Sequence, residues 1–154
     1  MFAAIGDTPY NIILFLHILT AFVGFAPAFV HPLLGGQMER ASLDGRPTVF
    51  SFMAQNSMRI YGGSIIVTGL LGFGVAGMSD EVFKVSQGWL VAAVIVWIAI
   101  NGVLHAGIVP AEKAVAAAGA ARDEAAEKKL QTAGGIATLL FLVQLYLMVF
   151  KPGL

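Results

Sequence analysis

The sequence predicts an all-α integral membrane protein, a single domain over residues 1–154 that folds as a bundle of four transmembrane helices. Its residues are 58% hydrophobic and only 12% charged, about half the charged fraction of a typical soluble domain. Its mean hydropathy is +0.83. Four stretches contain no Asp, Glu, Lys or Arg, and each can hold a helix that crosses a hydrocarbon core about 30 Å thick; they are residues 8–38, 60–79, 85–111 and 130–150.

The apolar residues in these stretches place the membrane helices at about 11–34, 60–78, 89–108 and 134–150. The apolar runs are continuous and lack the period-two alternation of a membrane β-barrel. The first ten residues contain no Lys or Arg, and the first apolar run is longer than a signal peptide. We therefore expect an uncleaved first helix, bent in its inner half by Pro27 and Pro32.

The basic residues predict the orientation. The two longer loops hold seven of the nine Lys and Arg residues: Arg40, Arg46, Arg59, Lys113, Arg122, Lys128 and Lys129. The other two, Lys84 and Lys151, lie in the short loop and at the C-terminus. Basic loops stay in the cytoplasm, so we expect both termini to face outward and the two longer loops to face inward.

The two longer loops carry patterns of local structure. Residues 44–47 read Asp-Gly-Arg-Pro, a turn in which Pro47 opens a helix leading into the second span. Residues 111–131 are rich in Ala, Glu and Lys, which favour helix. Glu124 and Lys128 are four residues apart, the spacing of a surface ion pair. These patterns predict that the third and fourth helices extend past the bilayer as a hairpin bent near Gly119.

Small residues at intervals of four predict where the helices pack, because close backbone approach holds membrane helices together. The second span carries Ser64, Thr68, Gly72 and Ala76, the first carries Thr20, Gly24 and Ala28, and the third carries Gly102 and Ala106. Asn101 and Gln144 are expected at similar depth near the bilayer centre. A hydrogen bond between them is the simpler interpretation, and a path for a polar substrate is the alternative.

The three histidines lie within the predicted spans, where ionisable groups are functional candidates. His17 is near the outer surface, level with Tyr146 as a hydrogen-bond partner, and His31 and His105 share a level near the inner end. His17 and His31 are about 21 Å apart along one helix, so one iron cannot bind both. The candidate cofactor is haem b, bound by His31 with His105 or by His17 alone; structural roles, or quinone or proton handling at His17, are the alternatives.

Several classes of protein are excluded or disfavoured. The chain has no cysteine, which removes disulfides, thiolate metal sites and iron–sulfur clusters. Its formal net charge of zero gives no reason to expect a nucleic-acid partner. It contains no P-loop, HExxH or GxSxG motif, so no catalytic or metal site is predicted. The four uncharged stretches contain no carboxylate, which disfavours a proton-coupled transporter.

Four short segments resemble one protein family in their order and spacing. They are Leu14-Phe15-Leu16-His17-Ile18-Leu19 with Val23-Gly24, Arg59-Ile60-Tyr61, Ile108-Val109-Pro110, and Leu147-Met148-Val149-Phe150-Lys151-Pro152-Gly153. The chain resembles the bacterial predicted integral membrane proteins numbered 2269 among the domains of unknown function. That resemblance implies four membrane helices and supplies no activity. The first segment is also similar to four-helix membrane haem proteins of the protoporphyrinogen oxidase and copper-resistance families, whose polar and basic patterns are missing here.

The leading functional hypothesis is a non-enzymatic accessory or structural subunit of the bacterial inner membrane. Such a subunit packs against lipids, other membrane proteins or copies of itself, and the small-residue faces favour this hypothesis. The first alternative is a membrane redox protein that binds haem b. The second is a small-molecule or ion transporter whose path is lined by Asn101 and Gln144.

Overall fold

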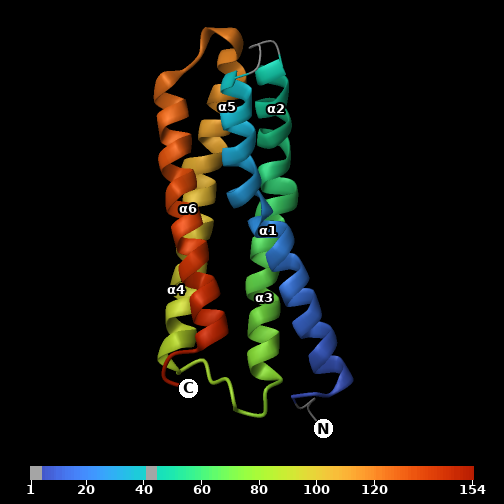
Figure 1. Ribbon diagram of the computed structural model, residues 1–154. Helices are drawn as coiled ribbons and strands as arrows, with labels where there is room; N and C mark the ends of the chain where they lie inside the picture. The colour runs from blue at the N-terminus through green and yellow to red at the C-terminus, as the bar shows by residue number, and fades with distance from the viewer. Residues whose placement is uncertain (1–4, 41–44) are drawn as a thin grey trace.

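The computed structural model describes residues 5–40 and 45–154, and this part of the chain is helical and contains no strand (Figure 1). The elements, in chain order, are α1 (Thr8–Arg40), α2 (Arg46–Asn56), the π-helical segment η2 (Ser57–Gly62), α3 (Gly63–Gly77), α4 (Gly88–Val103), the π-helical segment η3 (Leu104–Ile108), α5 (Val109–Ala118), the 3₁₀ turn η4 (Gly119–Ala121) and α6 (Glu124–Phe150).

These elements form four long helices, because α2, η2 and α3 follow one another without a break, as do α4, η3 and α5. All four are long and apolar enough to cross a membrane; the qualifying segments are Thr8–His31, Pro47–Gly77, Gly88–Ala118 and Glu124–Phe150. The all-α class and the number of apolar helices predicted from the sequence are therefore confirmed.

The second, third and fourth helices extend well beyond the predicted spans. The second begins at Arg46, well before the span predicted from residue 60, and Pro47 lies in its first turn as predicted, while Asp44 of the expected turn lies outside the described residues. The third continues to Ala118 and crosses Pro110 directly after η3, where the helix is already loosened. The fourth begins at Glu124, because residues with high helix propensity continue the apolar helix into the polar region.

The helices pack in pairs. Near the chain termini α1 lies against α3 and α4 lies against α6, while at the opposite end α2 and α6 both lie against α5. Figure 1 shows both termini at one end of the bundle, here called the terminal end, and the η4 turn at the other, here called the hairpin end. Figure 1 also shows a bend in α1, as expected for a helix that contains Pro27 and Pro32.

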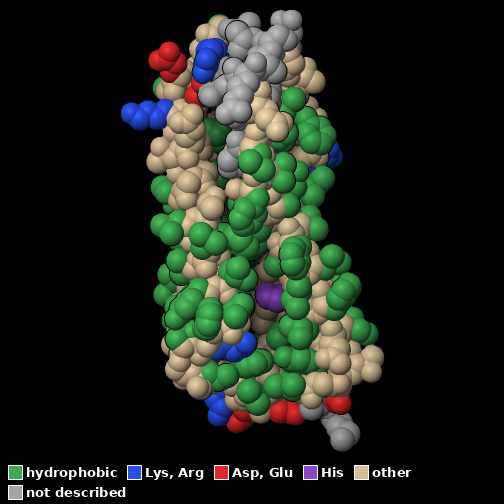
Figure 2. Space-filling view, in the orientation of Figure 1, with side chains coloured by type: hydrophobic (Ala, Val, Ile, Leu, Met, Phe, Trp, Pro, Cys, Tyr) green, Lys and Arg blue, Asp and Glu red, His purple; other side chains and the backbone are tan. Residues whose placement is uncertain are grey.

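Apolar side chains fill three buried clusters along the bundle. The central cluster contains Phe25, Ile65, Ile100, Leu104 and Val109; the terminal-end cluster contains Ala76, Trp89, Leu90, Ala93 and Leu147; the hairpin-end cluster contains Phe50, Met53, Val115 and Ala126. Large hydrophobic side chains also cover much of the outside (Figure 2). Such a surface is typical of a protein whose solvent is hydrocarbon.

The small residues of α1 and α3 face each other. An added Cβ at Gly24 would lie 2.7 Å from the Ile65 side chain, and one at Gly72 would lie 3.1 Å from the His17 ring. Thr68 donates a hydrogen bond from its hydroxyl to the Thr20 hydroxyl at 2.9 Å. Much of this small-residue surface therefore contributes to packing inside the bundle.

The other small residues of these stripes have different surroundings. Ala76 belongs to the terminal-end cluster, and the Ser64 carbonyl, 2.8 Å from the Thr68 hydroxyl, is the alternative acceptor for its one proton within α3. The Ala28 carbonyl accepts one from Thr138 of α6 at 3.5 Å. Gly102 has no atom within 4 Å of an added Cβ, and Ala106 is exposed.

Candidate functional site

A buried carboxylate lies between three helices in the hairpin half of the bundle. The Glu112 side chain, on α5, is 0% exposed. Ser57 donates a hydrogen bond from its hydroxyl to Glu112 Oε2 at 2.5 Å, and Nδ1 of His31 lies 3.4 Å from Oε1. Glu112 follows the third uncharged stretch directly and lies on the same continuous apolar helix, Gly88–Ala118.

The chemistry of this group depends on its partners, because a buried carboxylate is costly unless it is paired or hydrogen-bonded. Ser57 satisfies one oxygen of Glu112. The other oxygen, Oε1, accepts no hydrogen bond from the described residues, and its close neighbour is the His31 ring. Nδ1 of His31 and Oε1 of Glu112 thus form a buried polar contact of 3.4 Å between α1 and α5.

A cavity of about 580 Å³ adjoins this pair. Its polar or charged lining side chains are His31, Ser57, Tyr61, Glu127, Gln131 and Thr138, and its other lining residues are Gly24, Phe25, Pro27, Ala28, Phe50, Met53, Ile65, Ile100, Leu104, Ile108, Leu130, Gly134, Gly135 and Ala137. A concave, mostly apolar site with a few convergent polar groups is typical of small-molecule binding. Glu112 does not line the cavity, but it contacts Ser57 and His31, which do.

Two π-helical segments shape the wall of the cavity. The η2 segment contributes Ser57 and Tyr61, and the η3 segment contributes Leu104 and Ile108. π-bulges are rare in helices and occur frequently at functional sites. The rings of His31 and Tyr61 meet edge to face, with centroids 5.8 Å apart, so an aromatic neighbour from η2 helps to fix the His31 ring.

The structure gives His17 and His105 local hydrogen bonds and does not place them in this cavity. Nδ1 of His17 donates to the Thr68 carbonyl at 2.8 Å, and Nδ1 of His105 donates to the Asn101 carbonyl one turn earlier at 2.7 Å. His105 is exposed within η3, where the π turn alters the backbone hydrogen bonding. His31 and His105 thus do not face one shared site.

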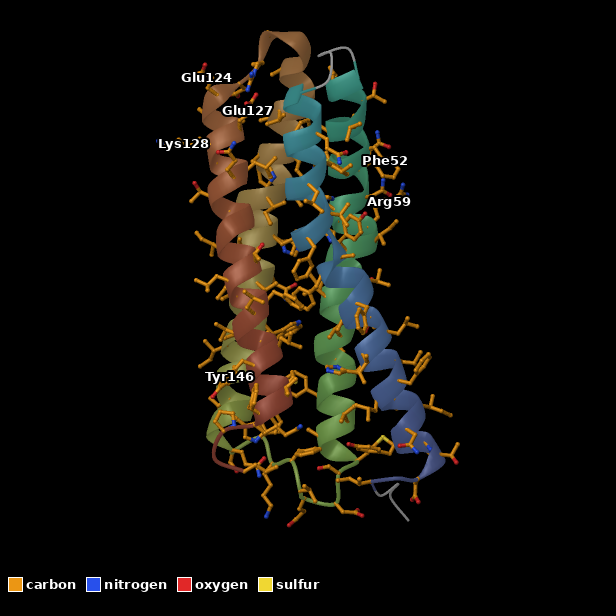
Figure 3. All side chains as sticks on the ribbon, in the orientation of Figure 1. Phe52, Arg59, Glu124, Glu127, Lys128 and Tyr146 are labelled. Atoms are coloured by element: carbon orange, nitrogen blue, oxygen red, sulfur yellow. The ribbon has the colours of Figure 1, made fainter. Side chains whose placement is uncertain are left out.

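Tyr146 does not reach His17 as expected. Its side chain is 52% exposed on the outer side of α6 (Figure 3), and its ring lies 4.9 Å from that of Phe150. On the same helix the predicted pair of Glu124 and Lys128 is not among the ion pairs of the described residues. Glu127 instead pairs with Arg122 at 2.6 Å.

Asn101 and Gln144 do not form the expected hydrogen bond. The Asn101 side-chain nitrogen donates to the Trp97 carbonyl, and the buried side-chain oxygens of both residues have no hydrogen-bond partner among the described residues. The register of α4 and α6 explains the difference. Gly107 lies beside Ala133, so Gln144, eleven residues further on, is level with about residue 96 and roughly 7 Å from the level of Asn101.

The cavity does not fit haem b. His31 is its one histidine, and neither Lys nor Arg lines it to pair with the two propionates. Within the described ranges no three His, Cys, Asp or Glu side chains cluster for a metal ion. The lining suits an organic molecule without strong negative charge.

Sequence reasoning identified His31 but missed Ser57, Tyr61 and Glu112. A helical pattern around the carboxylate was available: Ile108 and Val115, four residues before and three residues after Glu112, are apolar and lie on the same helix face. A carboxylate on an otherwise apolar face predicts a buried, partnered group. The prediction that residues 111–131 extend past the bilayer as a hairpin left Glu112 outside the search for buried groups.

Comparison of the chain with protein-family models, with curated proteins and with solved structures gave no match. The resemblance to the family numbered 2269 therefore stays a prediction. The cavity and the buried pair of His31 and Glu112 are the features that indicate a function.

Proposed function

We propose that this protein is a membrane-embedded binding protein for one small amphipathic molecule. The apolar body of the molecule occupies the cavity, and its uncharged polar head forms a hydrogen bond with His31. The observation that supports this proposal most is the 580 Å³ apolar cavity with His31 and Tyr61 in its wall and a buried carboxylate behind the histidine. The Tyr61 ring and the carboxylate 3.4 Å from Nδ1 restrict the orientation of His31, and a fixed orientation favours specific hydrogen bonding.

The depth of the cavity suits an amphipathic molecule. Ser57 is twenty residues from Gly77, which ends α3 at the terminal end, so the two are about 30 Å apart along the helix. This distance equals the thickness of a typical hydrocarbon core. The polar side of the cavity would then lie at the boundary between hydrocarbon and water, with its apolar side within the bilayer.

The accessory-subunit hypothesis rested on small-residue faces that a partner could contact. Gly24 meets Ile65 and Gly72 meets His17 within the chain, so the bundle itself occupies these positions on α1 and α3, and the exposed pair of Gly102 and Ala106 is the part of the stripes left for a partner. The transport hypothesis rested on Asn101 and Gln144, which do not line the cavity. The geometry therefore favours binding of a small molecule over these two functions.

Filling the cavity should abolish binding without unfolding the protein. An added Cβ at Gly134 meets no atom within 4 Å, and Gly134 lines the cavity, so Gly134→Leu places a side chain in the empty space. We expect 1-aminoanthracene, a fluorescent probe with a fused apolar body and one polar group, to bind saturably to the wild type in detergent. Its affinity should fall at least tenfold in Gly134→Leu and about tenfold in His31→Leu, because the hydrogen bond is lost.

Two control variants make this test specific. Gly102→Leu adds the same side chain at another glycine with open space around it, outside the cavity, and His105→Leu removes an exposed histidine. Both should bind the probe like the wild type. Equal affinity in wild type, Gly134→Leu and His31→Leu would contradict the proposal, as would the absence of saturable binding to the wild type.

We further propose that the protein lies in the bacterial inner membrane with both termini outside, because the hairpin end carries most of the basic residues. The chain has no cysteine, so single cysteines report their side of the membrane without background. In intact spheroplasts a membrane-impermeant maleimide should label Ser86→Cys and should label Ala121→Cys only after permeabilisation. The reverse pattern would overturn the orientation.

A further inference from the structure

A second concave surface lies on the outside of the bundle, separate from the cavity. It is a shallow groove of about 430 Å³ between α2–η2 and α5, lined by Ser51, Ala54, Gln55, Met58, Arg59, Lys113 and Ala116. Arg59 and Lys113 come from different long helices, and both are exposed. Neither forms an ion pair with a carboxylate of the described residues. The groove thus gathers two uncompensated positive charges.

The polar side chains of the groove add a hydrogen-bond donor. Gln55 donates from its side-chain nitrogen to the Ser51 hydroxyl oxygen at 3.2 Å. The hydroxyl proton of Ser51 has no acceptor among the described residues and can be donated to a ligand. Two cations and one hydroxyl donor together match the oxygens of a phosphate group, which prefers charge-assisted hydrogen bonds.

The groove lies at the depth of lipid headgroups. Arg59 is eighteen residues from Gly77 and Lys113 is twenty-five residues from Gly88, about 27 and 37 Å along their helices. A hydrocarbon core is about 30 Å thick. Measured from the terminal end, one distance is slightly shorter and the other slightly longer than this thickness, so the groove lies at the core boundary nearer the hairpin end. Phe52 and Ile60 follow the groove residues Ser51 and Arg59 in the sequence, and their side chains are 62% and 46% exposed. Figure 3 shows Phe52 and Arg59 on the same outer side of the α2–η2 helix.

We propose that this groove binds the phosphodiester of an anionic phospholipid in the leaflet at the hairpin end. Arg59 and Lys113 pair with the phosphate, Ser51 donates a hydrogen bond to it, and the exposed Ile60, on the hydrocarbon side of Arg59, lies along the acyl chains. A zwitterionic lipid is less favoured, because its own cationic group competes with these side chains for the phosphate. This site is independent of the cavity and of the function proposed for it.

Native mass spectrometry of the full chain in neutral detergent tests the proposal. The protein is titrated with phosphatidylglycerol or with phosphatidylcholine of the same acyl chains, and the fraction carrying one lipid is measured. We expect the wild type to prefer phosphatidylglycerol. Since each basic residue near an anionic lipid contributes about fivefold in affinity, Arg59→Gln and Lys113→Gln should each lower phosphatidylglycerol binding about fivefold and leave phosphatidylcholine binding unchanged.

Lys128→Gln is the matched control, because Lys128 is an exposed cation at the same end of the bundle and does not line the groove (Figure 3). It should bind phosphatidylglycerol like the wild type. An equal loss in Lys128→Gln would show non-specific attraction and overturn the site, as would unchanged binding in Arg59→Gln and Lys113→Gln. Displacement of the lipid by an equal concentration of inorganic phosphate would show that the groove binds free phosphate, and would overturn the assignment to lipid.

Discussion

Glu112→Ala is expected to lower the free energy of unfolding by about 3 kcal/mol, because it removes one partner from a buried polar network. The Ser57 hydroxyl loses its acceptor inside the bundle, and Nδ1 of His31 loses the carboxylate 3.4 Å away. The substitution also leaves a void at a position that is 0% exposed, which adds a packing cost. Titration with sodium dodecyl sulfate, followed by circular dichroism, would measure the change.

Two variants separate the charge of Glu112 from its shape. Glu112→Gln keeps the side-chain volume and an oxygen that accepts from Ser57, so we expect it to cost about 1 kcal/mol. The exposed Glu124, also at the hairpin end, gives the control Glu124→Ala, which should change stability by less than about 0.5 kcal/mol. If Glu112→Ala behaved like Glu124→Ala, the buried network would have no role in stability.

A double-mutant cycle tests the contact between Glu112 and Ser57 directly. Because the Ser57 hydroxyl donates to the carboxylate, Ser57→Ala should cost little once Glu112 has been replaced by alanine. We therefore expect the two single effects to exceed the effect of the double variant by about 1 kcal/mol or more. Strict additivity would contradict the hydrogen bond.

The number of helices could be predicted because hydrocarbon imposes a simple rule on the backbone. A segment without charged residues that is long enough to cross the bilayer must satisfy its own backbone hydrogen bonds, and a helix does so. That rule does not place the helix ends, because a charged residue ends a hydrocarbon segment and not a helix. The start of the second helix was predicted instead from Pro47, which lies in its first turn.

The candidate site was harder to predict, because its partners come from distant parts of the chain. Glu112 meets Ser57, 55 residues earlier in the sequence, and meets His31 on α1. These contacts depend on how the helices are aligned, which their composition does not specify. The same limit explains Gln144, whose level relative to Asn101 is fixed by the contact of Gly107 with Ala133.

The histidines show what the rule for ionisable groups inside a membrane can and cannot distinguish. That rule selected His17, His31 and His105 equally. The structure separates them by their hydrogen bonds: His17 and His105 donate to backbone carbonyls, whereas His31 faces a carboxylate and a cavity. The carbonyl acceptor for His17 is on another helix, so sequence spacing could not have identified it.

Gly69→Ala is expected to destabilise the bundle by about 3 kcal/mol, because it inserts a methyl group where Trp97 lies. An added Cβ at Gly69 would be 2.2 Å from the Trp97 ring, closer than atoms can approach. The ring cannot move freely, since its Nε1 donates a hydrogen bond to the Ile65 carbonyl at 2.8 Å. Overpacking typically costs 1–3 kcal/mol, and loss of this hydrogen bond adds about 1 kcal/mol.

The effect should be large because Trp97 joins the two helix pairs. Its hydrogen bond links α4 to α3, while Phe25 and Phe141, with ring centroids 4.3 Å apart, link α1 to α6. Displacing Trp97 therefore weakens one of the contacts between the α1–α3 pair and the α4–α6 pair. A shift in tryptophan fluorescence should accompany the loss of stability, measured by the same detergent titration.

Gly102→Ala is the matched control, because an added Cβ at Gly102 meets no atom within 4 Å. The change should stabilise the helix slightly, since alanine is a better helix former than glycine. Trp97→Leu should relieve the clash, so that Gly69→Ala costs less in the Trp97→Leu background than in the wild type. Equal stability of the Gly69→Ala and Gly102→Ala variants would contradict the packing of α3 against Trp97.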